Sequence, residues 1–232
     1  MIRVSTGIEG LNEMVNGGIP AGHTVLVMGP AGAGKTTCAL HFIWDGLVKD
    51  ESCLFISLEE DEQKILKTAA RYGWDFQRYV DKGTLLLLKL DVFDISATMA
   101  RLKSEMPKLI DSNSVSRVAI DPFTLLEIMY ETDHDRRVQT FELCNIISKT
   151  GATTMVTSEV GKDGRSSWFG LMEYVVDGVM LLRTTPITGG SEDRMVFTIW
   201  VTKMRWSNHS KEIKPYDITE KGIIIHSKSA VY

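Results

Sequence analysis

Residues 29–36 constrain the fold of this chain more than any other stretch. Their sequence, Gly-Pro-Ala-Gly-Ala-Gly-Lys-Thr, matches G-x-x-x-x-G-K-[ST] at every fixed position. An apolar run, 25–28, precedes the motif, and a helix-like stretch, 37–49, follows it. A strand, a glycine-rich turn and a helix in this order form a phosphate-binding P-loop. The chain is therefore predicted to fold around a P-loop.

The residue types of this loop suit a nucleoside triphosphate. Small residues let backbone N–H groups approach a phosphate closely, and a helix beginning near Lys35 adds the positive end of its dipole. Lys35 is predicted to reach the β- and γ-phosphates, and the Thr36 hydroxyl to bind Mg²⁺. The predicted phosphate-binding set is Gly32, Ala33, Gly34, Lys35, Thr36 and Thr37.

Length, charge and cysteine spacing limit the possible classes of function. The 232 residues are compatible with one domain, which we expect to span 1–232. A net charge of −4 provides no global basic field for nucleic acid, although a local basic patch remains possible. The three cysteines lie far apart and form no metal-binding spacing. With no signal peptide and no 18-residue apolar run, we expect a cytoplasmic protein without a membrane partner.

Helices and strands are predicted to alternate along most of the chain. Further strands are predicted at 52–58, 84–88, 118–121 and 152–158, and helices at 61–72, 95–109 and 136–149. We expect Pro107 to break the second of these helices, and Val138, Phe141, Leu143, Ile146 and Ile147 to face inward on the third. Beyond 158 we expect strands at 177–183, 195–204 and 222–225, with a hairpin loop over 185–193. This order predicts an α/β fold whose mainly parallel sheet carries antiparallel edge strands at the C-terminal end.

Four acidic residues follow the predicted strand at 52–58. Ligands of open α/β sheets bind beyond the carboxyl ends of the strands, which places these residues at the P-loop edge. Glu59 or Glu60 is therefore a candidate base that holds the water for attack on a γ-phosphate. Asp61 and Glu62 are better explained by a helix start, where acids complement the dipole. A role in the helix start also remains open for Glu59 and Glu60.

Asp121 ends the apolar run 118–120. An acid at the end of a buried strand, downstream of a P-loop, is the placement expected of a Walker B aspartate. Such a residue binds Mg²⁺ through water and orients the loop hydroxyl, here Thr36. The predicted metal-binding residues are therefore Thr36 and Asp121.

Nearly the whole chain resembles the RecA superfamily, and more closely the KaiC-like ATPases. The resemblance rests on Ser5-Thr6-Gly7-Ile8, Gly17-Gly18-Ile19-Pro20, Glu59-Glu60, Tyr72-Gly73-Trp74-Asp75 and Gly151-Ala152-Thr153-Thr154. The most specific part is the stretch 203–211, followed by Thr219 and Glu220, which is similar to the family's K-x-R-x-[ST]-x-H-x-K segment. The resemblance implies a RecA-like P-loop domain that binds ATP and Mg²⁺.

In KaiC hexamers the K-x-R segment meets the nucleotide held by the neighbouring subunit. By that resemblance Lys203 and Arg205 would approach the γ-phosphate from the next subunit. The remaining residues implied near the nucleotide are Met204, Ser207 and His209 from this segment, Thr219 and Glu220 at the base, and Arg71 from the same subunit. Alternation along a strand puts Lys203 and Arg205 on one side, which also suits a solvated basic strand end.

This chain differs from the clock-type proteins of the family in two ways. Those proteins are tandems of two such domains, whereas this chain matches one. Their second domain phosphorylates an adjacent Ser-Thr pair, and Glu173 and Tyr174 stand at the matching positions here. Autokinase activity of that kind is therefore not expected.

The P-loop residues predict an ATPase, and the resemblance implies active sites between subunits of a ring, a hexamer, with slow, regulatory hydrolysis. ATP and ADP are the expected ligands, and a regulatory protein is a possible partner. One alternative is a RecA- or RadA-like recombination ATPase, with Lys162, Arg165, Trp168 and Phe169 on a DNA-facing loop. The acidic composition disfavours it. A second alternative is an ATP-gated interaction module with little turnover.

Overall fold

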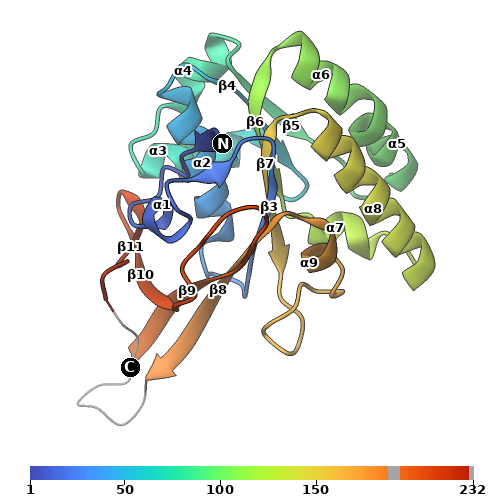
Figure 1. The fold of residues 1–232 in the computed structure, drawn as a ribbon. Coiled ribbons are helices and arrows are strands. Elements are labelled where there is room, and N and C mark those ends of the chain that lie inside the picture. Colours follow the sequence, from blue (N-terminus) through green and yellow to red (C-terminus); the bar gives the residue numbers. More distant parts are fainter. Residues whose placement is uncertain (188–193, 230–232) are drawn as a thin grey trace.

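The computed structural model describes residues 1–187 and 194–229, and a large sheet forms its centre (Figure 1). The strands of this sheet are β3 (Thr24–Gly29), β4 (Ser52–Ser57), β5 (Leu85–Lys89), β6 (Val115–Asp121), β7 (Thr153–Glu159), β8 (Gly178–Ile187), β9 (Arg194–Met204), β10 (Lys214–Thr219) and β11 (Gly222–Ile225). Their spatial order is β11-β10-β9-β8-β3-β7-β6-β4-β5. A separate pair, β1 (Arg3–Val4) and β2 (Ile19–Pro20), lies beside it.

The sheet is parallel from β5 to β8 and antiparallel from β8 to β11. The predicted α/β class is therefore confirmed, including the antiparallel strands at the C-terminal end. Strand β10 was missed by the sequence analysis. The predicted hairpin loop over 185–193 lies largely outside the described residues, and β8 continues through Ile187.

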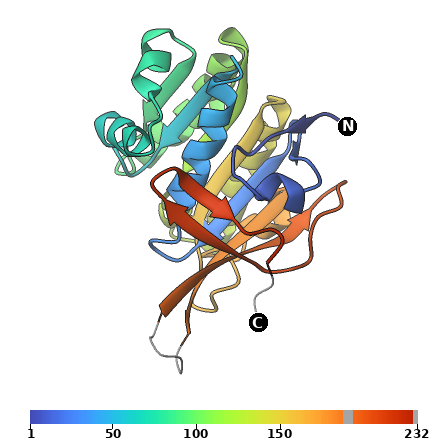
Figure 2. The same ribbon diagram turned by 90° about the vertical axis from the view of Figure 1, so that its left-hand side faces the viewer.

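Helices cover both faces of the sheet (Figures 1 and 2). One face carries α1 (Leu11–Met14), α2 (Lys35–Leu47), α3 (Glu62–Arg71) and α4 (Phe76–Asp81); the other carries α5 (Ile95–Ala100), α6 (Met106–Ser112), α7 (Thr124–Ile128), α8 (Asp133–Lys149) and α9 (Met172–Val175). Strand β3 shows why its sequence is continuously apolar. Val25 and Val27 join the first core, while Leu26 and Met28 join the second.

Two predicted helices differ from the structure. The segment expected to break near Pro107 is continuous, because the π-helical turn η1 (Arg101–Glu105) leads directly from α5 into α6. Pro107 stands at the start of α6, directly after the π-helical turn, and does not end the helix. On α8, Leu143 is buried but Val138 and Phe141 are 45% and 40% exposed. Residues two apart on a helix do not share a face, so Phe141 and Leu143 cannot both point inward.

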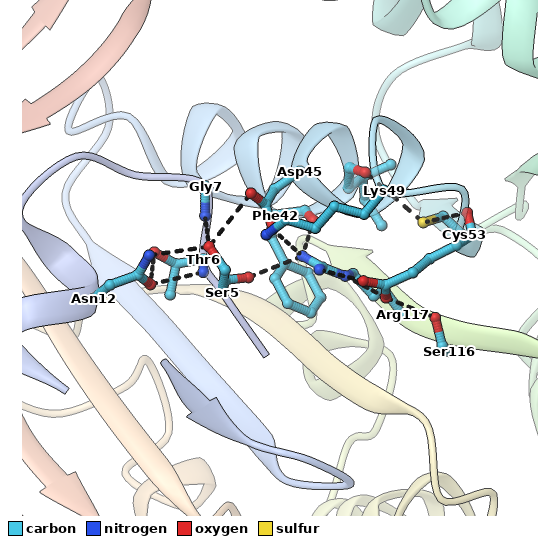
Figure 3. A network of polar contacts seen from close by, with 12 residues as sticks. Ser5, Thr6, Gly7, Asn12, Phe42, Asp45, Lys49, Cys53, Ser116 and Arg117 are labelled. Carbon is cyan, nitrogen blue, oxygen red and sulfur yellow. Dashed lines mark hydrogen bonds and ion pairs between the residues drawn. The ribbon is translucent and has the colours of Figure 1, made fainter. Parts of the chain in front are cut away.

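A buried ionic network fixes α2 against the sheet (Figure 3). Arg117 of β6 is 1% exposed, and its guanidinium forms ion pairs with Glu51 at 2.7 Å and Asp45 at 3.0 Å. It also donates to the carbonyl oxygens of Ser5 and Phe42. These contacts join the N-terminal segment, α2 and β6. Because α2 follows the P-loop directly, the network also holds the loop in place relative to the strands.

Candidate nucleotide-binding site

The backbone of the P-loop requires its glycines. Gly32 and Gly34 adopt left-handed φ values of 76° and 86°, which side chains disfavour. At Gly29 an added Cβ would lie 2.9 Å from the Cβ of Leu182 on the neighbouring strand β8. The loop therefore leaves β3 in the tight conformation that the motif predicts.

The first turn of α2 can bind a phosphate. Gly34 is the N-cap and supplies no side-chain acceptor, so the first N–H groups of the helix remain available to an anion. The ammonium group of Lys35 donates to the carbonyl oxygens of Gly29 at 2.9 Å and Pro30 at 3.0 Å. Burial lowers the pKa of Lys35, and the nearby carboxylates of Glu159 and Asp121 oppose this shift. The free N–H groups at the start of α2 and the Lys35 ammonium group are donors, which fits a polyphosphate.

Asp121 and Thr36 meet as the Walker B assignment predicts. The Thr36 hydroxyl donates to Asp121 Oδ2 at 2.8 Å, and the Thr157 hydroxyl donates to Oδ1. Burial raises the pKa of Asp121, whereas both hydrogen bonds act to lower it. No cluster of three or more metal-binding side chains occurs among the described residues. This arrangement fits Mg²⁺, which keeps several waters and takes few ligands from the protein.

Glu59 and Glu60 lie at the same edge of the sheet. Strand β4 runs beside β6 with Ser57 opposite Asp121, and the N–H of Leu58 donates to the Asp121 carbonyl at 2.9 Å. The Ser57 hydroxyl accepts from the N–H of Glu60 at 2.9 Å, and burial raises the pKa of Glu60. The structure therefore brings the loop, the predicted metal ligands and both candidate bases together.

The adjacent Asp61 has a structural role. Its carboxylate is the N-cap of α3 and accepts from the N–H of Lys64 at 2.9 Å. This contact agrees with the helix-start explanation for Asp61.

Glu159 was missed by the sequence analysis. It ends β7, which lies between β3 and β6, and in register it is opposite Gly29. Among the charged groups that act on Lys35, Glu159 has the largest effect. An acidic residue directly after the predicted strand at 152–158 was the available clue, since parallel strands of one sheet end at the same edge.

Arg71, Thr219 and Glu220 meet beside the P-loop of their own chain. They line a cavity of about 680 Å³ together with Tyr72, Gly73, Ile218 and Lys221. The hairpin of β10 and β11 packs directly on the loop, because the hydroxyl of Tyr216 donates to the Ala33 carbonyl at 2.6 Å. The Thr37 hydroxyl lies 3.3 Å from that of Tyr72, a residue of the cavity lining, but Thr37 itself is buried and does not line the cavity. The cavity can hold the base of a nucleotide bound to the same chain.

Lys203 and Arg205 lie at the opposite end of the strands from the P-loop, beside the amino end of β3. The register places Met204 beside Gly178 on β8, and Gly178 beside Val25 at the start of β3. The P-loop begins at the other end of β3, about 13 Å away for four residues of strand. The structure therefore separates these two cations from the P-loop of their own chain.

Three further predicted residues accompany this pair. Met204 is 5% exposed, so only its backbone is available to a ligand. The Ser207 hydroxyl accepts from Arg3 at 2.7 Å. His209 lies 3.0 Å from the ammonium of Lys211, and burial together with that charge lowers the pKa of His209.

A family model described as "ATPase: KaiC" matches residues 4–230. The chain belongs to the KaiC ATPase family. It is 32% identical over 241 residues to the circadian clock oscillator protein KaiC of Synechococcus elongatus, which covers 99% of this chain and 45% of that protein. It is 33% identical over 238 residues to KaiC of Parathermosynechococcus lividus, and that match covers 97% of this chain and 42% of the relative. The chain thus spans less than half the length of these relatives.

A solved structure from an archaeon matches nearly the whole of this chain. The KaiC-like protein of Pyrococcus horikoshii OT3 superimposes with a TM-score of 0.85 and 29% sequence identity. The match covers 97% of this chain and 99% of that one. The predicted resemblance to KaiC-like proteins is therefore confirmed. Among the helices described, none is both long and apolar enough to cross a membrane.

Replacing Lys35 in this KaiC-family chain tests the P-loop assignment. Lys35→Ala is expected to weaken ATP binding at least about 100-fold, because the half-buried cation that the P-loop assignment places against the phosphates is removed. Titration of a fluorescent ATP analogue measures the affinity. Lys49→Ala is the control, since Lys49 forms an exposed ion pair with Asp45 at the far end of α2. Equal affinities for both variants would contradict the assignment.

Proposed function

We propose that this chain is a Mg²⁺-dependent ATPase that acts as one domain and completes its active sites between the subunits of a ring. By analogy with the family, the ring is a hexamer and hydrolysis is slow and regulatory. The bound ATP takes the P-loop, Thr36 and Asp121 from one subunit. Lys203 and Arg205 come from the next subunit, with Ser207 and His209 beside them.

The separation of the cations from the P-loop carries this proposal. A lysine or arginine side chain is too short to span the length of β3, so neither cation reaches phosphates bound to its own chain. When identical subunits join head to tail, one edge of each subunit faces the opposite edge of the next, and closure gives a ring. The P-loop edge of one subunit then meets the cations of its neighbour.

Trp206, directly after the cation pair, supports an interface here. Its side chain is 79% exposed, and its backbone adopts a φ of 54°, which is strained for a bulky residue. Exposed tryptophans of this kind are typical anchors of protein interfaces. A neighbouring subunit would cover it.

The chemistry assigned to the site is hydrolysis of the terminal phosphoanhydride. Glu59 or Glu60 accepts a proton from water while the water oxygen bonds to the γ-phosphorus and the bond to the ADP oxygen breaks. Mg²⁺, when bound, neutralises charge on the β- and γ-phosphates. Thr36 and Asp121 hold its position, and Lys35 contacts the same phosphates. Lys203 and Arg205 of the neighbour stabilise the charge that spreads over the transferring group.

Removing the candidate bases should separate binding from turnover. The double variant Glu59→Gln with Glu60→Gln is expected to keep ATP affinity and lose hydrolysis roughly 10²- to 10⁴-fold, because the amides cannot accept the proton. Release of inorganic phosphate measures turnover, and nucleotide titration measures affinity. Glu62→Gln, in the first turn of α3, is the matched control. Hydrolysis at the rate of this control would remove both glutamates from the base role.

The DNA-binding alternative receives less support from the same structure. Phe169 lies under the guanidinium group of Arg136, 3.9 Å from ring centre to carbon, so this aromatic residue is engaged within the protein. In the same loop, Asp163 accepts hydrogen bonds from the backbone of Arg165 and Ser166 and adds negative charge. Of the two aromatic residues assigned to this loop, only Trp168, which is 46% exposed, offers an open stacking surface. We therefore favour the ring ATPase.

A further inference from the structure

The segment between β7 and β8 connects the two edges of the sheet that the proposed ring uses. Both strands run parallel to β3, so the chain must return from the end of β7 to the start of β8. It leaves from Glu159, opposite Gly29 at the P-loop, and arrives at Asp177, which precedes Gly178 beside Met204. This crossover, residues 160–177, thus joins the end of the strands that carries the P-loop to the end that carries Lys203 and Arg205 (Figure 1).

Contacts at the first end fix the crossover to the nucleotide edge. The carbonyl of Glu159 accepts from the N–H of Trp168 at 3.0 Å, and Val160 pairs with Ser167 in an isolated bridge. The N–H of Glu159 donates to the hydroxyl of Thr124 at 2.8 Å. Thr124 lies three residues after Asp121 and begins α7. Ser167 is therefore tied to strand ends that surround the P-loop.

Contacts at the second end hold the cations. The ammonium group of Lys203 donates to the carbonyl oxygens of Glu173 at 2.8 Å and Val176 at 2.6 Å. The guanidinium group of Arg205 donates to the carbonyl of Tyr174 at 3.1 Å and pairs with Asp177 at 3.3 Å. All of these acceptors belong to α9 and the two residues after it. The position of this short segment therefore sets the position of both cations.

Glu173 links the two ends. Its carboxylate accepts from the N–H of Ser167 and from the Ser167 hydroxyl, the latter at 2.7 Å, while its carbonyl holds Lys203. Ser167 is 1% exposed, so water competes little for these bonds. Helix α9 has four residues, too few to be stable alone, and its placement depends on such tertiary contacts.

We propose that Glu173 is a positioning residue for Lys203 and Arg205, and that the crossover makes their placement respond to the nucleotide on the same subunit. When nucleotide binding shifts the strand ends beside the P-loop, Glu159 and Ser167 shift with them. Glu173 is hydrogen-bonded to Ser167, so α9 shifts as well, together with the carbonyl groups that bind Lys203 and Arg205. Since the cations serve the next subunit, each site influences its neighbour around the ring. This inference rests on the proposed shared site and adds its regulation.

The test compares two adjacent serines in the assembled protein. Ser167→Ala removes the hydroxyl that donates to Glu173, whereas Ser166→Ala removes a hydroxyl that donates to Asp163 within the loop. For Ser167→Ala and for Glu173→Ala we expect unchanged ATP affinity, kcat lower by roughly 10- to 100-fold, and a Hill coefficient for ATP that falls to about one. Ser166→Ala should match the wild type. Glu173→Gln, which keeps an acceptor for the Ser167 N–H, should be intermediate.

The outcomes separate this inference from the function on which it rests. If Arg205→Ala abolishes turnover while Ser167→Ala and Glu173→Ala keep the wild-type kcat and Hill coefficient, the shared site stands and the positioning role is wrong. A loss of ATP affinity in step with kcat would also overturn it, because that pattern indicates local damage. If Arg205→Ala itself keeps full turnover, the shared site is wrong and the inference falls with it.

Discussion

Two inactive variants are expected to regain ATP hydrolysis when they are mixed. Arg205→Ala removes the cation offered to the next subunit and should lower turnover about 10³- to 10⁵-fold. The double variant Glu59→Gln with Glu60→Gln removes the base but keeps Arg205. In a mixed ring, an Arg205→Ala subunit that receives Arg205 from a double-variant neighbour has a complete site. Random mixing of equal amounts makes about one quarter of the sites complete.

Phosphate release from the mixture, compared with each variant alone, measures this recovery. Light scattering in the presence of Mg-ATP must first establish that each variant assembles as the wild type does. A mixture of the double variant with Arg165→Ala, an exposed arginine in the crossover, is the control for subunit exchange. Activity no greater than the sum of the two separate variants would show that the active site is complete within one chain.

The free energy of unfolding is expected to fall between pH 5 and pH 9 because of Glu127. This residue of α7 is 1% exposed, and neither carboxyl oxygen has a partner within the described residues. Burial, with the added charge of Glu173, raises the pKa of Glu127 from 4.5 to about 8, although Arg136 opposes the shift. Glu173 faces Glu127 from α9, and Arg136 and Cys144 face it from α8.

The direction follows from the proton balance of the two states. A folded-state pKa above the unfolded value means that the native protein holds a proton which the unfolded chain has released. The resulting stability is fully present below pH 4.5 and is lost as the pH rises through about 8. The full change corresponds to roughly 3 to 5 kcal/mol.

Urea unfolding at pH 5, 7 and 9 checks this expectation. Relative to Glu127→Gln, whose amide does not titrate, the wild type should lose about 3 to 5 kcal/mol between pH 5 and 9. Glu131→Gln, at an exposed position shortly after α7, is the control and should parallel the wild type. Parallel curves for the wild type and Glu127→Gln would contradict a buried neutral carboxyl group.

The residues of the P-loop edge could be predicted because each is marked by its local sequence. Lys35 and Thr36 belong to a contiguous motif, and Glu59 and Asp121 each follow an apolar run. Parallel strands end at one edge of a sheet, so these separate local patterns imply one site. Glu159 also follows a predicted parallel strand directly, but it belongs to no recognised motif.

Other features depend on contacts between distant segments. The outward position of Val138 on α8 is set by which side of the helix packs on the sheet, and alternating apolar residues do not specify that side. Tyr72 and Glu220 line one cavity only because the β10–β11 hairpin folds back onto α2. The hydrogen bonds between Ser167 and Glu173 likewise form only because the crossover, residues 160–177, brings these two residues together.

By itself, the sequence determined the P-loop, the alternation of helices and strands, and the resemblance to the KaiC family, because each is carried by short-range patterns of residue type. Only the tertiary structure decided that Lys203 and Arg205 lie at the sheet edge opposite their own P-loop. That placement follows from the order β9-β8-β3 and its register, which put Met204 level with Val25. Strand order is set by the burial of apolar faces across the whole sheet, and no single stretch of the chain encodes it.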